Sequence, residues 1–403
     1  MSEMSYLEKL LDGVEVEWRN LGDTSLFEIA NNGRKPVKAS LRIAGETPYY
    51  GANNIQDYVD GYTHDGEYVL IAEDGSASLE NYSIQYATGK FWANNHVHVV
   101  RGKERIHSRF LYHYLCIVNF LPFLTGGGRA KLTKGQLIEI PVPIPCPENP
   151  EKSLAIQSEI VRILDKFTAL TAELTAELNM RKKQYNYYRD QLLSFKEGEV
   201  EWKTLGEIGK WYGGGTPSKN KIEFWENGNI PWISPKDMGR TLVDSSEDYI
   251  TEEAVLQSST KLIPANSIAI VVRSSILDKV LPSALIKVPA TLNQDMKAVI
   301  PHENILVKYI YHMIGSRGSD ILRAAKKTGG SVASIDSKKL FSFKIPVPNI
   351  NEQQRIVEIL DKFDTLTNSI TEGLPREIEL RQKQYEYYRD LLFNFPKPET
   401  VSN

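Results

Sequence analysis

The sequence lacks the features that mark membrane, secreted and disulfide-rich proteins. No stretch approaches the roughly 20 consecutive apolar residues that a membrane-spanning helix needs. The first residues show none of the basic, apolar and small-residue zones of a signal peptide. Only two cysteines occur, Cys116 and Cys146, and they lack the CxxC spacing of a zinc site. We therefore expect two reduced thiols in a cytoplasmic protein.

Motifs of the common catalytic sites are also missing. The chain has no GxxxxGK[ST] phosphate loop, no HExxH and no nucleophile elbow. It also lacks the Asn-Pro-Pro-aromatic tetrapeptide of adenine methyltransferases and a glycine loop for adenosylmethionine. His96 and His98 would form a metal pair at most, and a hydrogen-bonded pair near the surface is the commoner arrangement. These absences predict a recognition protein without a catalytic site or metal site of its own.

An excess of positive charge is absent as well, but the total hides a pattern. Lys and Arg number 48 against 51 Asp and Glu, for a formal net charge of -3. This balance argues against a polybasic tail protein, although a basic face can lie within a neutral total. Residues 205–345 carry 18 Lys/Arg against 14 Asp/Glu, residues 19–145 carry 13 against 12, and the remainder is acidic. That asymmetry is the one expected if both segments face phosphates.

The most informative feature that is present is a repeat of about half the chain. Four matches recur in the same order: Glu139–Pro143 with Lys344–Pro348, Ile160–Phe167 with Ile356–Phe363, Lys183–Asp190 with Lys383–Asp390, and Val16–Trp18 with Val200–Trp202. The last copy stops short of a Val-Glu-Trp, and the N-terminus supplies it. The two ends together rebuild one central segment, which predicts a circular arrangement with pseudo-two-fold symmetry.

Each repeated segment is expected to contain a long helix. Apolar residues from Leu154 to Ser194 recur mostly at steps of three and four, as on one face of a helix. The second copy runs from about Asn351 and should break near Gly373 and Pro375. We interpret the pair as an antiparallel coiled-coil spacer.

Between the helices lie two segments that resemble each other only faintly. Both mix short strands, such as Tyr68–Ala72 and Ser267–Val272, with a short apolar helix, Phe110–Phe120 or Val307–Ile314. The predicted fold class is α+β, with two α/β recognition domains separated by the two helices. The predicted boundaries are 1–18 for a segment completing the C-terminal repeat, 19–145 for domain 1, 146–204 for the central repeat, 205–345 for domain 2 and 346–403 for the C-terminal repeat.

Loop residues of the two domains are candidates for contact with nucleic acid. They combine amides, hydroxyls, cations and aromatic rings of the kind that bind base edges and phosphates. In domain 1 these are Tyr49, Asn53, Asn54, Lys90, Trp92, Asn94, Asn95, Arg129 and Lys131. In domain 2 they are Gly214, Thr216, Ser218, Lys219, Trp232, Ser234, Lys236, Arg273, Ser274, Asn293, Gln294, Lys297 and Ser331. A turn or scaffold role is the alternative for each.

A tandem Thr-Ala-Glu-Leu lies in the first long helix, formed by Thr171, Ala172, Glu173, Leu174, Thr175, Ala176, Glu177 and Leu178. One such unit adds about 6 Å of helix. It is either helical filler of good propensity or a ruler that sets the distance between its flanks. From Phe167 to Gln184 the first copy spans 17 residues, and from Phe363 to Gln384 the second spans 21, a difference of one unit.

Together, the two variable domains, the paired helices with their Ile-Pro-Val-Pro entries and the circular order resemble the specificity subunit of type I restriction-modification systems. The tandem Thr-Ala-Glu-Leu resembles the spacer of the type IC branch. The resemblance implies that each domain reads one half of a bipartite, asymmetric double-stranded DNA site in the bacterial cytoplasm. It also implies that two modification subunits and the restriction subunits are partners, and that S-adenosylmethionine, ATP and Mg²⁺ belong to them.

The duplicated repeat ends are the candidate surface for the modification subunits. The residues are Trp18, Tyr185, Tyr188, Arg189, Trp202, Tyr385, Tyr388 and Arg389. Simple packing of the helix pair is the alternative for these aromatic residues. For the chain as a whole, the competing interpretations are a protein–protein scaffold without DNA readout and a DNA-binding enzyme with a cryptic catalytic site.

Overall fold

The computed structural model describes residues 9–10, 13, 15–126, 130–327, 332–369 and 371–396. The chain forms two compact units: Met1–Glu173 with Glu379–Asn403, and Leu174–Ile378. Each unit therefore contains one of the two dissimilar domains together with helical segments from both repeats.

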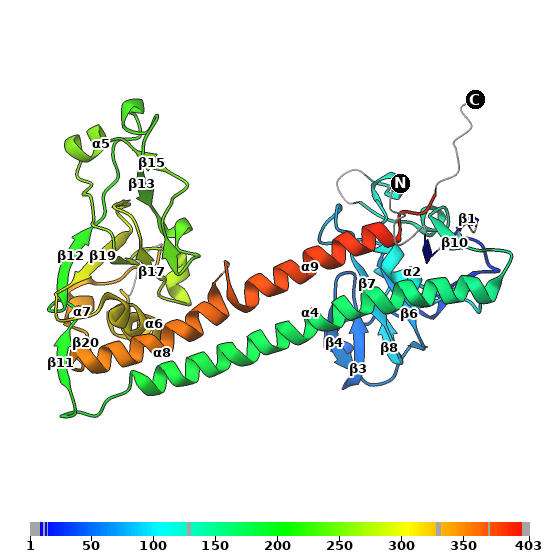
Figure 1. The fold of residues 1–403 in the computed structure, drawn as a ribbon, viewed down its shortest axis with the longest axis horizontal. Helices are drawn as coiled ribbons and strands as arrows, with labels where there is room; N and C mark the ends of the chain where they lie inside the picture. The colour runs from blue at the N-terminus through cyan, green and yellow to red at the C-terminus, as the bar shows by residue number, and fades with distance from the viewer. Residues whose placement is uncertain are drawn as a thin grey trace. The chain divides into compact units, whose positions relative to one another are not determined.

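In the first unit, domain 1 is built on two four-stranded sheets and a separate two-stranded sheet (Figure 1). One sheet has the order β2-β9-β6-β7, with strands Phe27–Ile29, Val97–Gly102, Tyr68–Ala72 and Ile84–Ala87. The other has the order β4-β3-β8-β5, with strands Ile55–Val59, Ala44–Tyr50, Lys90–Ala93 and His64–Asp65. The two-stranded sheet pairs β1 (Val16–Asn20) antiparallel with β10 (Pro141–Pro145). The short helices are η1 (Asn31–Gly33), η2 (Ala39–Leu41), α2 (Ser108–Leu115), η3 (Leu121–Phe123) and α3 (Lys134–Leu137).

In the second unit, domain 2 repeats this plan with different strand lengths. A five-stranded sheet has the order β12-β19-β16-β17-β14, with strands Gly209–Gly213, Met296–Pro301, Ser267–Val271, Ser283–Ile286 and Leu242–Val243. A three-stranded sheet, β15-β13-β18, comprises Tyr249–Ile250, Ile230–Ile233 and Thr291–Leu292. A two-stranded sheet pairs β11 (Glu201–Thr204) antiparallel with β20 (Lys344–Val347). The helices are η4 (Ile222–Phe224), η5 (Pro235–Asp237), α5 (Glu252–Gln257), η6 (Ser275–Asp278), α6 (Val307–Ala325) and α7 (Ser337–Ser342).

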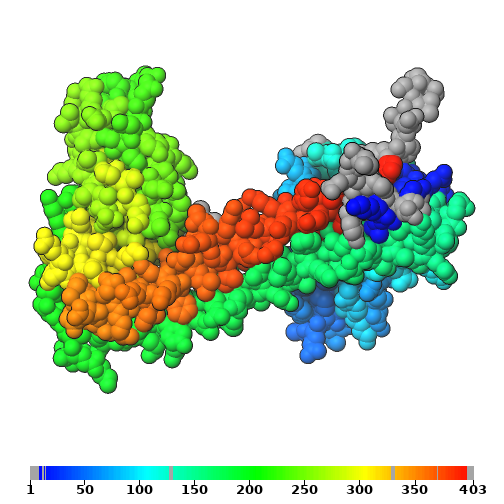
Figure 2. Space-filling model, viewed as in Figure 1, coloured from blue at the N-terminus to red at the C-terminus, as the bar shows by residue number. Residues whose placement is uncertain are grey.

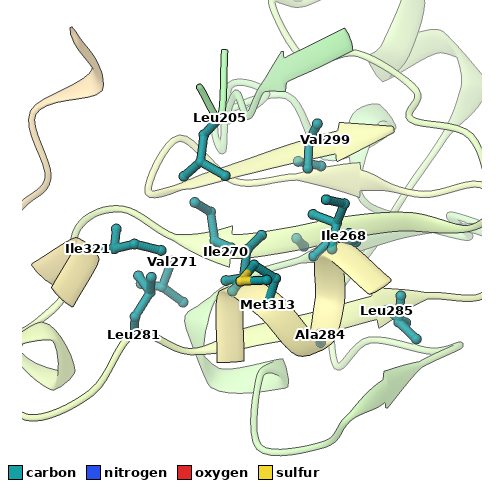
Figure 3. Packing of buried hydrophobic residues seen from close by; sticks show 14 of the residues in the cluster. Leu205, Ile268, Ile270, Val271, Leu281, Ala284, Leu285, Val299, Met313 and Ile321 are labelled. Atoms are coloured by element: carbon teal, nitrogen blue, oxygen red, sulfur yellow. The ribbon is translucent and has the colours of Figure 1, made fainter. Parts of the chain in front are cut away.

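The central strand of each domain is apolar and fully buried, as the sequence predicts. All five residues of β6 and all five of β16 are buried. In domain 2, Ile268, Ile270 and Val271 of β16 pack with Met313 and Ile321 of α6 (Figure 3). Because the strand is covered on both faces, its sequence is continuously hydrophobic rather than alternating.

The predicted short helices differ in extent from the observed ones. Helix α2 ends at Leu115, five residues before the predicted Phe120. Helix α6 instead continues to Ala325, past the predicted end at Ile314. The helix runs through Gly315 and Gly318, and Ile321 and Ala325 beyond them are completely buried. Burial of those side chains outweighs the modest helix-breaking tendency of glycine.

The long helices of the repeats begin and break where the sequence indicates. Helix α4 spans Pro150–Leu192, against a predicted Leu154–Ser194. The second copy is divided into α8 (Ile350–Asn368) and α9 (Gly373–Leu392). Gly373 has φ +80, and a Cβ there would lie 2.4 Å from the carbonyl oxygen of Thr365, so only glycine fits. The second copy is longer than the first by one four-residue unit. That extra length corresponds to the interval between α8 and α9, so it does not add helix.

Within each unit, helices from both repeats pack together. In the first unit, Phe167 of α4 stacks on Tyr388 of α9, with ring centroids 5.2 Å apart. In the second, Tyr188 of α4 stacks on Phe363 of α8, at 5.7 Å. Figure 2 shows α8, in orange, lying directly against the yellow segments of domain 2.

The N-terminal segment meets the end of the C-terminal repeat in the first unit. The indole Nε1 of Trp18 donates a hydrogen bond to the carbonyl oxygen of Pro396, at 2.8 Å. Leu10 packs in the same apolar cluster as Phe393 and Phe395. Because β1 starts at Val16, the framework of domain 1 begins before the predicted boundary at Arg19.

Candidate nucleic-acid interface

The same tight turn forms one edge in both domains. In domain 1 the parallel strands β3 and β8 end together, and Asn94 follows β8; in domain 2, β13 and β18 do the same, and Asn293 follows β18. Each asparagine donates its backbone N–H across the parallel pair, to the carbonyl of Tyr50 at 3.2 Å or of Ile233 at 2.9 Å. We call the surface around these two turns the reading edge of each domain.

The side chains of the two asparagines stabilise the turn instead of facing solvent. Asn94 Oδ1 accepts from the backbone N–H of His96 at 2.8 Å, and Asn293 Oδ1 accepts from that of Asp295 at 2.9 Å. Both residues are buried, whereas Asn95 and Gln294 at the tips of the turns are exposed. Two of the predicted contacts are therefore framework, and the residue after each carries the accessible amide.

Domain 2 has an open pocket of about 490 Å³ at its reading edge. Its lining includes the predicted residues Gly214, Arg273, Gln294 and Lys297, together with Gly213 and Met296 from the same two loops. The sequence did not single out the other lining residues: Val272, Lys327, Val332, Ser334, Ile335 and Ser337. Three of these side chains are cations, and none of the described lining residues is a carboxylate. The pocket has the charge that a DNA phosphate backbone requires.

The cations of this pocket are only weakly neutralised: the Asp336 carboxylate, which lies between the lining residues Ile335 and Ser337 in sequence, interacts electrostatically with Lys327. Arg273 is exposed, and neither Arg273 nor Lys327 forms an ion pair with any residue in the described part of the chain. The Nζ of Lys297 lies 5.8 Å from the centroid of the Phe341 ring. The backbone of Arg273 bridges to that of Ser334, which brings together segments 61 positions apart.

The glycine run of domain 2 serves close packing more than phosphate binding. A Cβ on Gly214 would lie 1.7 Å from the carbonyl oxygen of Asn293, so this position requires glycine. The N–H of Gly214 donates to Met296 at 3.1 Å, and that of Gly215 donates to Leu292 at 2.8 Å. Thr216 donates its hydroxyl to Gln294 across the turn. The predicted N–H donors of this loop are thus mostly occupied within the protein.

At the equivalent edge of domain 1, acidic side chains neutralise the cations. Glu73 and Asp74 stand where domain 2 has Val272 and Arg273, because β6 and β16 occupy the same place. Glu73 pairs with Nη1 of Arg34 at 2.5 Å and with Nζ of Lys131 at 3.0 Å. Burial alone would raise the pKa of Glu73, but these hydrogen bonds outweigh it and hold the pKa below its ordinary value.

His96 and His98, the candidate metal pair of domain 1, do not act as a pair. His96 is exposed and its Nδ1 lies 2.6 Å from Asp74 Oδ1. His98 is completely buried, with Nε2 2.7 Å from the carbonyl oxygen of Leu132 and Nδ1 2.9 Å from the amide of Asn31. Burial lowers the pKa of His98, which keeps the ring neutral. No cluster of three or more His, Cys, Asp or Glu suited to a metal occurs among the residues that the structure describes.

Several predicted contacts of domain 1 are scaffold residues in the structure. Tyr49 is 1% exposed, and its hydroxyl accepts from the N–H of Val37 at 3.0 Å. Trp92 stacks on Tyr49 and donates its Nε1–H to the carbonyl of Lys35 at 2.7 Å. Asn53 uses both ends of its amide, donating to Gly75 and accepting from Ala77, each at 2.8 Å.

The exposed members in domain 1 are Asn53, Asn54, Lys90, Asn95 and Lys131. Lys90 lies over the Tyr62 ring, with Nζ 4.8 Å from its centroid. Arg129 lies outside the described residues.

Domain 2 shows the same division. The Nε1–H of Trp232 donates to Gly215 at 2.9 Å and the ring is 6% exposed, so this residue belongs to the core. Ser234 is buried and forms a capping box with Asp237, and Ser274 caps η6. Lys236 is paired with Glu247 at 2.8 Å and with Asp248 at 3.0 Å, which raises its pKa. Ser218 and Lys219 are exposed, and Ser331 lies outside the described residues.

Sequence reasoning also missed a basic loop in domain 1. The segment 34–43 contains Arg34, Lys35, Lys38 and Arg42 and no acidic residue. Lys35 and Lys38 are exposed and form no ion pair within the part of the chain that is described. Tyr49 and Trp92 hold this loop through its backbone, at Val37 and Lys35. The run of four cations was the signal that could have identified it.

The predicted partner surface divides into buried and exposed rings. Tyr185 and Tyr385 are partly buried, each hydrogen-bonded to a histidine of a domain, and burial raises the pKa of each to about 12. Tyr188 and Tyr388 are 46% and 41% exposed. Tyr187 and Tyr387, beside them, are more exposed, at 61% and 65%. The accessible surface is therefore the second and third tyrosines of each repeat.

The other predicted partner residues are partly exposed. Arg189 and Arg389 lie over the Tyr185 and Tyr385 rings, at 5.6 and 5.5 Å, and each pairs with the aspartate that follows it. Trp202 is 36% exposed, whereas the Trp18 indole is fixed by its bond to Pro396.

The tandem Thr-Ala-Glu-Leu lies wholly within α4. Its first leucine, Leu174, begins the second unit, and Glu173 ends the first. Leu174 and Leu178 are half-buried, whereas Ala172, Glu173, Thr175 and Ala176 are exposed. Thr171 donates its hydroxyl to the carbonyl of Phe167 at 2.9 Å.

Comparison with known proteins finds one family and several close relatives. The family described as "Type I restriction modification DNA specificity domain" matches the chain twice, over residues 14–181 and 197–380. The chain is 70% identical to the EcoR124I/EcoR124II specificity subunit of Escherichia coli, over 100% of both sequences. It is 36% identical to the EcoprrI specificity subunit of the same species, covering 92% of this chain and 93% of that protein.

Among solved structures, the S subunit of a type I restriction-modification system from M. genitalium matches with a TM-score of 0.59. The match covers 96% of this chain and 98% of that one, at 17% sequence identity. This likeness shows a shared fold.

Proposed function

Since the chain belongs to the type I restriction-modification DNA specificity family, as a specificity subunit that recognises DNA sequence, we propose that each reading edge binds one half of a bipartite, asymmetric site. The observation that carries this proposal is the pair of matched edges with unlike chemistry. At the same position, domain 2 presents a cationic pocket, whereas domain 1 presents amides and ion-paired side chains. Equivalent positions with different side chains suit two different half-sites.

The repeat helices are proposed to hold the two readers apart. The packing of α4 against α9 in one unit and against α8 in the other supports an antiparallel coiled-coil spacer. The contact of Trp18 with Pro396 supports the circular, pseudo-two-fold arrangement. Two readers on such a spacer would meet half-sites about one DNA turn, roughly 34 Å, apart.

We also propose a division of labour with other subunits. The chain supplies recognition without catalysis, and adenine methylation and restriction belong to modification and restriction subunits with S-adenosylmethionine, ATP and Mg²⁺. The duplicated Tyr187–Tyr188 and Tyr387–Tyr388 surfaces support two equivalent docking sites, hence two modification subunits for each chain. The setting is the bacterial cytoplasm; within the described chain, no helix is both long and apolar enough to cross a membrane.

The test uses the chain purified in complex with its modification subunits. Methylated adenines in DNA treated with the complex define the site, and a duplex carrying that site is compared with a scrambled duplex over a series of salt concentrations. We expect salt-sensitive binding with a clear preference for the site. Absence of any preference would favour the alternative, a protein–protein scaffold without DNA readout. Methylation by the chain alone would show a catalytic site of its own.

A further inference from the structure

A buried histidine in domain 1 joins that domain to helices from both repeats. His113 of α2 is completely buried. Its Nε2 lies 2.8 Å from Oδ1 of Asp165 on α4, and its Nδ1 lies 3.0 Å from the hydroxyl of Tyr385 on α9. The Nε of Arg109, one turn earlier on α2, binds the same Asp165 oxygen at 2.8 Å. Three elements therefore meet at one polar cluster inside the first unit.

The second unit contains the same cluster, made from equivalent residues of the repeat. His312 of α6 is 2% exposed, with Nε2 3.0 Å from Oδ1 of Asp361 on α8. Its Nδ1 lies 3.3 Å from the hydroxyl of Tyr185 on α4. Lys308 takes the place of Arg109 and binds Asp361. In the first unit the central repeat supplies the aspartate and the C-terminal repeat supplies the tyrosine. In the second unit these two roles are exchanged.

The proton positions follow from the partners. A carboxylate can only accept, so Nε2–H of each histidine donates to the aspartate, and Nδ1 accepts from the tyrosine hydroxyl. Burial lowers the pKa of His113, consistent with a neutral ring. Burial alone would raise the pKa of Asp165, but hydrogen bonds from His113 and Arg109 outweigh it and lower that pKa. Each group of the cluster is thereby satisfied within the protein.

These directional bonds differ in effect from the apolar contacts around them. Ile160 and Leu164 of α4 pack in the same core as Phe110 of α2, which stabilises the contact. Apolar burial is non-directional, so a domain could rotate slightly on its helices at small cost. Hydrogen bonds need a narrow range of angles and distances, so the cluster restricts that rotation.

We propose that His113–Asp165–Tyr385 and His312–Asp361–Tyr185, here called the domain latches, fix the orientation of each reading domain on its helices and thereby the length of the DNA gap between the half-sites. The inference rests on the proposed function. The latch residues are positioning residues, because they act on the reading edges through the body of each domain. The latch occurs in both domains although their reading edges differ. This is expected if the latch controls domain orientation and does not determine which bases are recognised.

The test removes one oxygen atom from each latch. Tyr385→Phe and Tyr185→Phe keep the ring and its stacking but lose the hydroxyl that binds histidine. Tyr309→Phe is the matched control, since it also removes one buried tyrosine hydroxyl, but that hydroxyl donates to the carbonyl oxygen of Pro346 on β20 at 2.9 Å and not to a latch histidine. Each chain is assembled with its modification subunits and given duplexes that have identical half-sites but gaps of the normal length, one base pair longer or one base pair shorter.

We expect the ratio of methylation at the normal gap to that at the altered gaps to fall about three- to tenfold in each latch variant, the size of effect of one buried hydrogen bond. The base preference within each half-site and the Tyr309→Phe ratio should stay as in the unmodified chain. An unchanged ratio, or an equal loss at all three gaps, would overturn the latch. If the unmodified chain itself shows no site preference, the proposed function fails instead.

Discussion

The two domains share their interior framework and differ where that framework meets solvent. Both end a parallel strand pair in a buried asparagine turn, and both attach to the helices through a histidine, an aspartate and a tyrosine. At the reading edge, however, Arg273 of domain 2 is replaced by Asp74 in domain 1, and Ser334 is replaced by Lys131. The buried positions keep their chemistry because packing and hydrogen bonding constrain them, and the edge is free to diverge.

The difference also predicts how the two domains would hold DNA. Domain 2 offers three cations around an open pocket, and domain 1 pairs Arg34 and Lys131 at its edge with Glu73. Domain 2 should therefore contribute more of the salt-dependent binding affinity. Domain 1 should bind mainly through amide contacts and through its basic loop at 34–43.

The largest expected effect comes from exchanging one domain. Replacing residues 19–145 with the corresponding domain of another specificity subunit should change one half-site completely and leave the other unchanged, because each edge lies within its own domain. Sequencing of methylated adenines before and after the exchange measures both halves. A change in both half-sites would contradict the separation of the two readers.

Lengthening the spacer should alter the gap without altering either half-site. A third Thr-Ala-Glu-Leu unit after Leu178 adds about 6 Å of helix, which corresponds to one or two base pairs. The same sequencing reports the gap. A gap of the original length would contradict the hypothesis that the tandem Thr-Ala-Glu-Leu sets the gap. The tandem would then be ordinary helical sequence.

Removing the central cation of the domain 2 pocket should weaken binding substantially. We expect Arg273→Ala to cost about 1–3 kcal/mol and to reduce the salt slope by roughly one. The comparison is Lys131→Ala in domain 1, which should cost no more than about 1 kcal/mol because Lys131 is already paired with Glu73. Titration of the specific duplex at several salt concentrations measures both. Equal losses would mean that the two edges do not differ as described.

Removing the neutralising acid of domain 1 should make its edge resemble that of domain 2. Glu73→Gln leaves Lys131 and Arg34 without their carboxylate, so the salt slope should steepen by about one, with a small gain in non-specific affinity. Glu46→Gln, on an exposed residue near the start of β3, makes the same change in net charge and serves as the control. A steeper slope in both variants would indicate an effect of net charge alone.

The sequence predicted the parts of the fold that depend on periodicity. The repeat, the long helix, the break before Gly373 and the buried strands β6 and β16 all leave a regular pattern of apolar residues or a glycine at a required position. The ends of the short helices were predicted less accurately. Helix α6 continues beyond its predicted end because Ile321 and Ala325 are buried by contacts that only the folded domain provides.

The site was harder to predict because its residues depend on partners distant in sequence. Tyr49 and Trp232 have the composition of base-stacking residues but fill the core, and Lys236 is held by two acids. Lys327 and Arg273 are distant in sequence but line the same pocket in the folded domain. Residue type indicated the region, whereas accessibility and ion pairing had to come from the structure.

The most direct test is a map of methylated adenines in a host that carries this chain with its modification subunits, compared with the same host carrying Arg273→Ala. We expect one bipartite, asymmetric motif with a fixed gap, and in the variant less methylation of that motif, with any change in the bases read confined to one half-site. A continuous or symmetric motif, or a variant that changes the bases read in both halves, would contradict the assignment of one half-site to each reading edge.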